Sequence, residues 1–446
     1  MQSGGKQPYC LSRNRFKVFE EGFGEGLFVK KSLPDKKDLY MIELPRIFIT
    51  EKGERHAKSG HPWVFEGEVV KIDGTPENGD LVHVFSPKER FLGTGYYNAN
   101  SKIRVRLISR NANDKFDADF YERRIRYALD YRKTVMGDDF RSSRLIFGEA
   151  DQFPGLTVDL FEDIIVAQTL CLGTEKIKDM LFETLVRVLP EYGVNVRRLY
   201  ERCDVAVREL EGMEQFCGYW KPEMFSGDAD GHVTITENGI HYDVNYIDGQ
   251  KTGFFLDQKY NRQAAAKLAK GRRVLDCFTH TGAFALNCAA GGAEHVTAVD
   301  ISETAIEQTK KNAAMNGLTD RMSFLCTDVF KLLTDMVNEK RHDYDYIILD
   351  PPAFTKSSST VRDAYRGYKD INLRAMRCLP RGGYLATCSC SHFMKTELFE
   401  KMLADAAGDA GVSLRQIEHR TQSPDHPILW NVPETDYLKF YLFQVV

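Results

Sequence analysis

The stretch VLDCFTHTGAF, residues 274–284, decides the fold class of this chain. Its apolar start is typical of a buried strand that closes at Asp276, and the following loop carries Gly282 and opens a helix. A glycine lets the backbone approach a ligand closely, and a helix N-terminus offers free N–H groups. The loop lacks the pattern G-x-G-x-x-G, so a dinucleotide pyrophosphate fits poorly. The chain also lacks G-x-x-x-x-G-K-[ST], which argues against an NTPase.

The same strand-and-helix rhythm continues from about Gln258 to the C-terminus. The apolar runs RRVLDCF, HVTAVDI, MSFLCTD, DYDYIILDPP and GGYLATCS alternate with segments of helical spacing. This alternation predicts an α/β domain, namely an open and mostly parallel sheet with helices on both faces. Ligands of such sheets bind beyond the carboxyl ends of the strands. The residues that close each strand are therefore the candidate site residues.

An aspartate closes each of the first four of these strands. They are Asp276, Asp300, Asp328 and Asp350, and Asp300 follows Asp276 by 24 positions. A carboxylate at the end of the second strand can accept hydrogen bonds from both ribose hydroxyls of a nucleoside. The carboxylate at the end of the third strand can accept a hydrogen bond from an adenine amino group. Each aspartate alone is weak evidence for a binding site, since Asp is common in turns and at N-caps. Four in register, without a pyrophosphate loop, favour an adenosine that carries a sulfonium and an amino acid.

The length of 446 residues is too great for one ordinary core and predicts two or three domains. Short strands punctuated by DGTPENGD and NANS indicate a small β-barrel-like domain, and a long helix then opens an α+β unit. The expected divisions are a leader of appended character at 1–40, a β-barrel-like domain at 41–113, a middle α+β domain at 114–235 and the parallel-sheet domain at 236–446.

Composition narrows the class of protein further. The chain is 43% hydrophobic and 28% charged, a composition typical of a globular protein. Its net charge of −4 does not by itself indicate a protein that binds nucleic acid. It has no apolar run near 18 residues and its polar start, MQSGGKQPYC, is no secretory signal, so we expect a cytoplasmic protein without a membrane partner. The ten cysteines include no C-x-x-C pair, and we therefore expect neither a disulfide scaffold nor a metal site.

The motifs together resemble a known family. VLDCFTHTGAF, AVDIS, CTDVF and LDPPAF, in this order, look like the motifs of class I S-adenosylmethionine-dependent methyltransferases, which have a Rossmann-like fold. ERHAKSGHPWVFEGEV and GYYNANSKIRVRLIS resemble a PUA RNA-binding domain, and GFFLDQKYNR resembles a segment of one RNA-modifying group. Nearly everything after residue 40 thus resembles the bacterial large-subunit (23S) rRNA cytosine-C5 methyltransferases. The resemblance implies S-adenosylmethionine as cofactor, ribosomal RNA as partner, and compatibility with a homodimer.

The resemblance also implies which residues meet the cofactor. They lie at the ends of the first three strands and in the loops that follow. The expected cofactor-binding residues are Asp276, Phe278, Thr279, Gly282, Asp300, Ile301, Asp328 and Val329.

Two thiols, Cys388 and Cys390, stand one residue apart in ATCSCSHF, residues 386–393. C5 of cytosine is a poor nucleophile, and a thiolate that adds to C6 makes C5 reactive. Residues two apart share a face of a strand, but Cys390 lies nearer the open end of its strand, where the family places the nucleophile. We therefore expect Cys390 to be the nucleophile rather than Cys388. The alternative is that both are small core residues.

Asp350 is the second expected catalytic residue. In LDPPAF it can hydrogen-bond the edge of a cytosine and stabilise a protonated N3. Pro351 and Pro352 lock the backbone so that a carbonyl can face an exocyclic amino group, and Phe354 could stack on the base or belong to the core. The base that removes the C5 proton stays unassigned, because a lone histidine such as the nearby His392 is more often structural than catalytic.

A basic stretch joins the first two expected domains. Phosphate contacts from such a stretch position an RNA without reading its sequence, although any one residue could equally lie on a solvated helix face. Trp63 is expected to anchor the barrel rather than to stack on a base. The basic residues, of which Arg104 and Arg106 are the expected RNA contacts, are Arg104, Arg106, Arg110, Lys115, Arg123, Arg124, Arg126, Arg132 and Lys133.

Two other functions compete with cytosine-C5 methylation. D-P-P-x-[FY] motifs also accompany methylation of exocyclic amines, so a methyltransferase acting on a guanine nitrogen without a covalent thiol is the first alternative. The second is a non-catalytic RNA-binding factor for ribosome assembly. The intact acids at four strand ends argue against the second, because a relic has no reason to keep a nucleoside site.

Overall fold

The computed structural model describes residues 44–226, 229–355 and 357–446, and the expected leader at 1–40 lies outside them. Residues 44–446 form one compact unit with four β-sheets. Along the chain a six-stranded sheet comes first and the mostly parallel seven-stranded sheet last. Among the described helices, none is both long and apolar enough to cross a membrane.

The first sheet has six strands in the order β2-β6-β5-β4-β1-β3. Its pairs are antiparallel except β1 with β4, and its core is a separate cluster of buried aliphatic side chains that includes Ile47 and Val84. Thr50 caps helix α1 by accepting from the amide of Gly53. The elements are β1 (Arg46–Ile49), α1 (Glu51–Lys58), β2 (Trp63–Phe65), β3 (Val69–Asp73), β4 (Leu81–Phe85), β5 (Phe91–Tyr97) and β6 (Ile103–Ser109).

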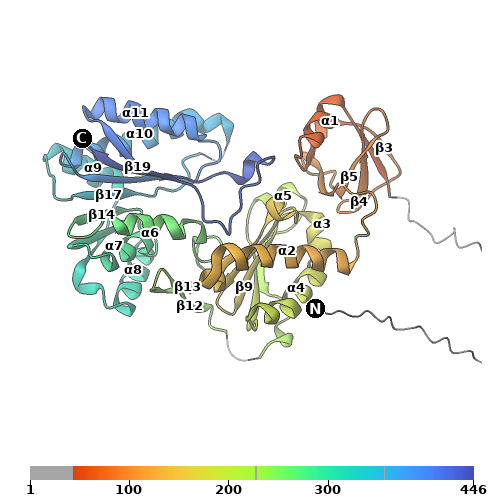
Figure 1. The fold of residues 1–446 in the computed structure, drawn as a ribbon, viewed down its shortest axis with the longest axis horizontal. Coiled ribbons are helices and arrows are strands. Elements are labelled where there is room, and N and C mark those ends of the chain that lie inside the picture. The colour runs from red at the N-terminus through yellow and green to blue at the C-terminus, as the bar shows by residue number, and fades with distance from the viewer. Residues whose placement is uncertain (1–43, 227–228, 356) are drawn as a thin grey trace, which may run out of the picture. The chain divides into compact units, whose positions relative to one another are not determined.

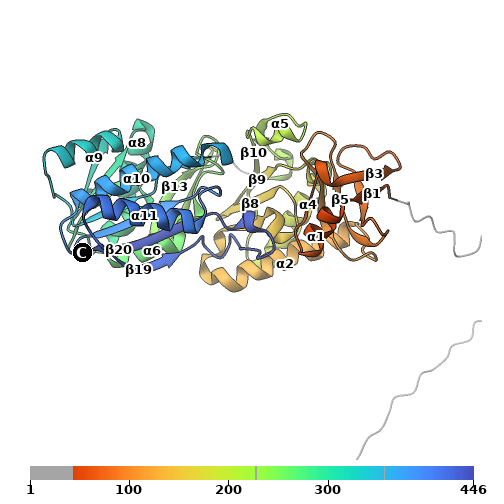
Figure 2. The same ribbon diagram turned by 90° about the horizontal axis from the view of Figure 1, so that it is seen from above.

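The middle region is a five-stranded sheet, β11-β10-β9-β8-β7, that packs on helices. Helix α2 begins at the Asp117 cap and ends where Gly137 adopts a positive φ of 55°. Its apolar face packs on α4 and β7, and Figure 2 shows α2 and α4 beside β8 and β9. The elements are α2 (Ala118–Met136), β7 (Ser142–Phe147), β8 (Leu156–Phe161), β9 (Ile164–Thr169), α3 (Leu172–Lys176), α4 (Lys178–Val188), β10 (Arg198–Cys203), α5 (Val207–Leu210) and β11 (Phe216–Tyr219).

A two-stranded hairpin, β12 (His232–Glu237) and β13 (Ile240–Asn245), introduces the last region. Its turn is Asn238–Gly239, with φ of 54° and 79°, the backbone that a two-residue hairpin turn requires. The domain boundary expected between residues 235 and 236 falls inside β12. The hairpin packs as one piece against the last region, since Ile235 and Tyr242 belong to the same buried cluster as its sheet.

The last sheet has seven strands in the order β16-β15-β14-β17-β18-β20-β19. The first five run parallel, and β20 and β19 add an antiparallel edge. The expected α/β fold with a mostly parallel sheet is thereby confirmed. The strands are β14 (Arg273–Cys277), β15 (His295–Asp300), β16 (Met322–Cys326), β17 (Tyr346–Leu349), β18 (Tyr384–Ser389), β19 (Leu414–Arg420) and β20 (Lys439–Val445).

Helices cover both faces of this sheet. Figure 1 shows α9, α10 and α11 on one side and α6, α7 and α8 on the other, and Figure 2 agrees that α10 and α11 lie side by side. This two-sided cover explains why the central strands are apolar on both faces. The helices are α6 (Lys259–Lys267), α7 (Ala283–Ala290), α8 (Glu303–Met315), α9 (Val329–Asn338), α10 (Val361–Cys378) and α11 (Thr396–Ala410).

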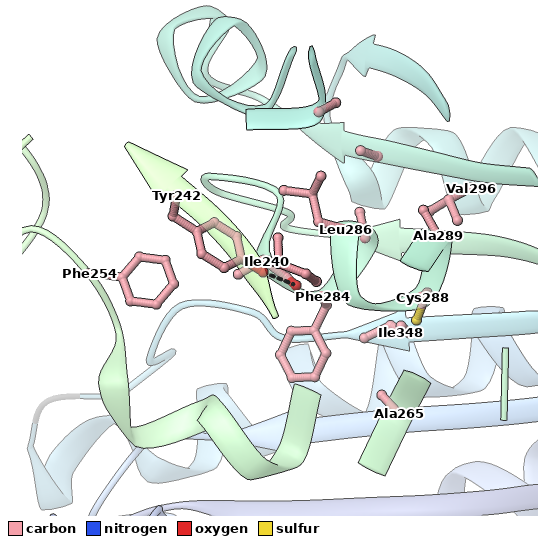
Figure 3. Packing of buried hydrophobic residues seen from close by; sticks show 14 of the residues in the cluster. Ile240, Tyr242, Phe254, Ala265, Phe284, Leu286, Cys288, Ala289, Val296 and Ile348 are labelled. Carbon is pink, nitrogen blue, oxygen red and sulfur yellow. Dashed lines mark hydrogen bonds between the residues drawn. The ribbon is translucent and has the colours of Figure 1, made fainter. Parts of the chain in front are cut away.

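The hairpin, α6 and α7 meet in one hydrophobic core. Figure 3 shows Tyr242 of β13 beside Phe254, whose ring centroids lie 5.0 Å apart, with Phe284 of α7 nearby. Within this core Arg262 of α6 donates to both carboxylate oxygens of Glu237 at 2.6 and 2.7 Å and to the carbonyl of Phe255. A buried charge is tolerated only when it is paired in this way. The pair fixes the segment Phe255–Gln258 against the hairpin.

Candidate active site

All four expected aspartates lie at the carboxyl edge of the parallel sheet, three of them at the ends of the adjacent strands β15, β14 and β17 and Asp328 just past the edge strand β16. Asp276 is the penultimate residue of β14, Asp300 is the last of β15, and Asp350 follows β17 directly. Because β14 pairs in parallel with both β15 and β17, these three chain positions reach the same edge. The strand ends therefore gather three carboxylates of distant sequence position in one place.

The loop after β14 has an unusual backbone. Phe278 and His280 have φ of 65° and 52°, which side-chain-bearing residues rarely adopt. Gly282 has φ of 84°, and a Cβ there would lie 2.5 Å from Cγ2 of Thr309. Glycine is thus required at 282 by both backbone and space. Clusters of such conformations are typical of ligand-binding loops.

Asp276 is the most deeply buried of the expected cofactor residues, with 1% exposure. Its Oδ2 accepts from the hydroxyl of Thr279 at 2.6 Å and from the amide of Ala285 at 3.0 Å, whereas its Oδ1 is buried without a protein partner. Burial, with a smaller contribution from the nearby Asp350, raises the pKa of Asp276 to about 7. Asp276 thus fixes the loop through Oδ2, while its Oδ1 stays available to accept a hydrogen bond from a ligand.

Asp300 is held by the backbone on both sides. Its Oδ2 accepts from the amide of His280 at 3.0 Å, and its Oδ1 accepts from the amide of Ser302 at 2.9 Å. The carboxylate therefore joins the β14 loop to the start of α8. Next to it Ile301 is 69% exposed, which places an apolar side chain in solvent beside a strand end.

Asp328 and Val329 lie at the end of β16. Asp328 is exposed and caps α9, since its Oδ1 accepts from the amide of Lys331 at 2.9 Å. Val329 is 3% exposed and belongs to the core between the sheet and α9. The structure thus gives both residues a local role, Asp328 as the N-cap of α9 and Val329 in the core.

The two thiols differ in position. Cys388 lies inside β18, pairs with Phe440 of β20 and has 0% exposure. Cys390 follows the last residue of β18 and is partly exposed. The strand therefore ends between the two thiols, as the sequence predicts.

The surroundings of Cys390 keep its thiol protonated. Burial, and then the carboxyls of Asp350 and Asp257, raise the pKa of Cys390 to about 12, while the ammonium of Lys439 opposes this rise. Lys439 is 3% exposed and donates to the carbonyls of Ser391 at 2.6 Å and Tyr437 at 2.7 Å. Burial lowers the pKa of Lys439 to about 8. The chain thus places a positive charge beside the thiol that must become a thiolate.

Asp350 joins the thiol end of the site to the loop before α6. Its Oδ1 accepts from the side-chain amide of Gln258 at 3.2 Å. Burial, and then the charge of the neighbouring Asp257, raise the pKa of Asp350 to about 7. A carboxyl group of this kind exists in both protonation states near neutral pH and can donate or accept a proton.

Sequence reasoning missed three residues of the site, Asp257, Gln258 and Lys439. Asp257 accepts from the hydroxyl of Tyr437 at 2.6 Å through Oδ2, and its Oδ1 is buried without a protein partner. Asp257 and Gln258 belong to GFFLDQKYNR, a stretch whose resemblance could have drawn attention to them. Lys439 had a weaker signal, a lone lysine that opens the apolar strand KFYLFQV.

The residues after Asp350 mostly pack inward. Pro351 is buried and Pro352 exposed. The ring of Phe354 lies 4.5 Å from that of Tyr368 of α10 and 6.0 Å from that of Phe330, so it is half-buried in an aromatic cluster. His392 has a pKa that burial lowers, and its Nδ1 is buried without a protein partner.

The two arginines expected to meet RNA are engaged with the protein. Arg106 is 8% exposed and donates to Glu149 at 2.9 Å and to Glu211 at 3.0 Å, which ties β6 to the middle region. Arg104 donates to the exposed Glu66 at 2.7 Å and to the carbonyl of Asn98. In this fold the charge of Arg106 is therefore neutralised inside the protein and not presented to a phosphate. Trp63 donates to Glu149 at 2.9 Å and acts as an anchor.

Comparison with known proteins places this geometry in a family. A model of S-adenosylmethionine-dependent methyltransferases matches residues 210–444, and a PUA-like domain model matches residues 47–110. A ribosomal RNA large subunit methyltransferase I from Alteromonas mediterranea is 39% identical over 402 residues, which cover 90% of this chain and 98% of the relative. This chain belongs to the ribosomal RNA large subunit methyltransferase I family.

Other relatives of this methyltransferase agree. The enzyme of the same name from Photobacterium profundum is 40% identical over 396 residues, which cover 88% of this chain and 97% of the relative. A Streptococcus mutans structure described as a SAM-dependent methyltransferase has a TM-score of 0.75 at 23% identity and covers 90% of this chain and 100% of its own. A methyltransferase structure complexed with SAH has a TM-score of 0.76 at 22% identity, again with 90% and 100% coverage. The two structures support the fold.

The chemistry of the strand-end loops fits S-adenosylmethionine, the cofactor of the family. Within the described part of the chain, the buried oxygen atoms without a hydrogen-bond partner include three on Asp257, Asp276 and Thr281. Two of them belong to carboxyl groups, which suit the amino group and the sulfonium of this cofactor and would repel phosphates. Bound here, the cofactor supplies an electrophilic methyl group.

Proposed function

We propose that this methyltransferase forms 5-methylcytosine in large-subunit ribosomal RNA through a covalent bond between Cys390 and C6 of the base. The observation that carries the proposal is the position of Cys390, directly past the end of β18, among Asp350, Asp257 and Lys439. Methylation of a guanine nitrogen needs no thiol at this place. The names of the relatives support large-subunit ribosomal RNA as the substrate.

The proposed cofactor site follows the strand ends. Asp300 accepts from the ribose hydroxyls, Ile301 covers one face of the adenine, and Asp328 accepts from the adenine amino group. The unpaired oxygen of Asp276 faces the cationic end, which Phe278, Thr279, Gly282 and Val329 help to shape. The exposure of Ile301 supports this assignment, because the apolar side chain gains cover only when a ligand is bound.

Asp300→Ala is expected to raise the Kd for S-adenosylmethionine by about 10- to 100-fold, because a hydrogen bond to a charged group contributes about 1.5–3 kcal/mol. Isothermal titration calorimetry measures this directly. Asp320→Ala removes an exposed carboxylate outside the site and serves as the matched control. An unchanged Kd for Asp300→Ala, with a folded protein by circular dichroism, would remove Asp300 from the cofactor site.

The chemical steps assigned to this chain begin with the thiolate of Cys390, which bonds to C6 of the cytosine. The electrons of the C5–C6 double bond then become available at C5, while Asp350 donates a proton to N3. After C5 is methylated, a base removes the C5 proton, the C6–S bond breaks, the thiolate leaves and N3 returns its proton to the carboxylate of Asp350. Cys390 is thus regenerated, as covalent catalysis requires.

Lys439 acts as a positioning residue in this proposal. Its ammonium lowers the pKa of Cys390, against a burial effect and two carboxyl groups that raise it. Its bond to the carbonyl of Ser391 also fixes the backbone next to the thiol. The charge of Lys439 therefore favours the thiolate at the moment when it attacks C6.

The product distinguishes this proposal from its alternatives. Protein-free large-subunit rRNA is incubated with the enzyme and S-adenosylmethionine, and its nucleosides are separated and weighed by mass spectrometry. We expect one new species, 5-methylcytidine. A methylguanosine would instead establish the nitrogen-directed reaction, and no methylated nucleoside on either naked rRNA or isolated large subunits would leave an RNA-binding role.

A further inference from the structure

An indole ring stands in solvent on the loop between β19 and β20. Trp430 is 95% exposed, the highest value among the large hydrophobic side chains of the described residues, and the next is Ile301 at 69%. The other two tryptophans are engaged with the protein, since Trp220 is 4% exposed and Trp63 donates to Glu149. An aromatic ring in water forgoes the free energy that burial would provide, so its exposure calls for a partner.

The loop that carries Trp430 is firmly held. It connects β19 to β20, and a turn closed by the amide of Val432 and the carbonyl of Leu429 at 2.7 Å presents the ring. The hydroxyl of Thr435 accepts from the amide of Leu429 at 2.9 Å and donates to the carbonyl of Val432 at 2.7 Å. A rigid turn that exposes an indole loses little entropy when a flat ligand stacks on it.

The residues that follow Trp430 reach two different parts of the molecule. Asn431 donates to the carbonyl of Gly60, and Glu434 lies 3.1 Å from the ring nitrogen of His61, both in the PUA-like region. Further along the chain, Tyr437 and Lys439 contact Asp257 and the carbonyl of Ser391 beside Cys390. Trp430 thus directly precedes a segment that connects the PUA-like region with the proposed nucleophile.

We propose that Trp430 is a stacking platform for a single-stranded RNA base that flanks the methylated cytosine. The choice of an RNA base as occupant rests on the proposed function, because the loop runs from a site that would receive one flipped base of an RNA strand. Neighbouring bases of that strand are unstacked and offer flat faces to an aromatic ring. Such stacking accepts any base and adds affinity without sequence selection.

Kinetics on protein-free large-subunit rRNA test this role. Trp430→Ala is expected to raise the KM for RNA about tenfold and to leave the KM for S-adenosylmethionine unchanged, whereas Trp430→Phe keeps a stacking face and stays within about threefold. Leu210→Ala removes a side chain that is 68% exposed elsewhere and should change neither value. An unchanged KM for RNA in Trp430→Ala overturns the proposal.

Fluorescence tests the contact itself. Tryptophan fluorescence is followed while poly(C) is titrated into the wild-type enzyme and into Trp430→Phe. The variant retains only Trp63 and Trp220, so its signal gives the background from light absorption by the RNA and from quenching at these two residues. We expect the wild type to be quenched more strongly than this background, and equal quenching in both proteins overturns the proposal. A defect of Trp430→Ala on assembled subunits but not on naked rRNA would indicate a protein partner and overturns it as well. If the wild type methylates no RNA but excess quenching persists, the proposed reaction fails and the RNA contact stands.

Discussion

Cys390→Ala is expected to reduce methyl transfer to rRNA by about 10⁴-fold or more, the scale of loss when a covalent nucleophile is removed. Without the thiolate no bond forms to C6, and C5 stays unreactive. The thiol contributes no contact to the strand-end acids that are assigned to the cofactor, so the Kd for S-adenosylmethionine should be unchanged. Single-turnover transfer of a labelled methyl group and calorimetric cofactor binding measure the two effects.

Cys388→Ala is the matched control for this substitution. Cys388 is fully buried inside β18 and pairs with Phe440 of β20, so the loss of its side chain leaves a small cavity and lowers stability modestly. Methyl transfer should remain within about tenfold of the wild type, because the chemistry does not use this thiol. If Cys388→Ala loses the activity and Cys390→Ala keeps it, the assignment of the nucleophile is reversed.

Asp350→Asn is expected to slow methyl transfer by about 10²- to 10⁴-fold, the usual contribution of a positioned acid or base. The amide keeps the size of the side chain and can still hydrogen-bond the cytosine edge, but it cannot deliver a proton to N3. The variant should therefore bind RNA with nearly the wild-type KM and lose kcat. A loss confined to KM would contradict proton donation by Asp350 and leave it a binding role.

The pH profile follows from the same carboxyl group. The pKa of Asp350 is raised from 3.8 to about 7, so the protonated donor is fully present well below pH 7 and is lost as pH rises through that value. In single turnover the wild-type rate should rise with thiol ionisation below pH 7 and level off above it, because the loss of protonated Asp350 then offsets the gain in thiolate up to the pKa of Cys390, at about 12. The rate of Asp350→Asn should continue to rise above pH 7.

The strand ends were predictable because their signals are local. An apolar run that closes on aspartate, followed by a turn and a helix, predicts β14, β15 and β17 together with Asp276, Asp300 and Asp350. The parallel arrangement follows from the helices between the strands, since parallel strands need such connections.

The rest of the site depends on contacts between distant segments. Lys439 lies 49 positions from Cys390 in sequence, and only the antiparallel pairing of β20 with β18 brings it beside the thiol. Arg106 belongs to a basic stretch in the sequence, but Glu149 and Glu211 neutralise it from the middle region. The sequence allowed Phe354 either to stack on the RNA base or to pack in the protein core. In the structure its ring packs against the rings of Tyr368 and Phe330 on the core side. Pattern alone does not contain such long-range partners.

One crosslinking measurement tests covalent cytosine-C5 methylation most directly. Large-subunit rRNA that contains 5-fluorocytidine is incubated with the enzyme and S-adenosylmethionine, and the denatured complex is mapped by peptide mass spectrometry. Fluorine at C5 cannot leave as a proton does, so the thioether at C6 should persist. We expect a covalent protein–RNA complex joined at Cys390 and none with Cys390→Ala. Methyl transfer to ordinary rRNA without any crosslink on the fluorinated RNA would contradict the covalent mechanism.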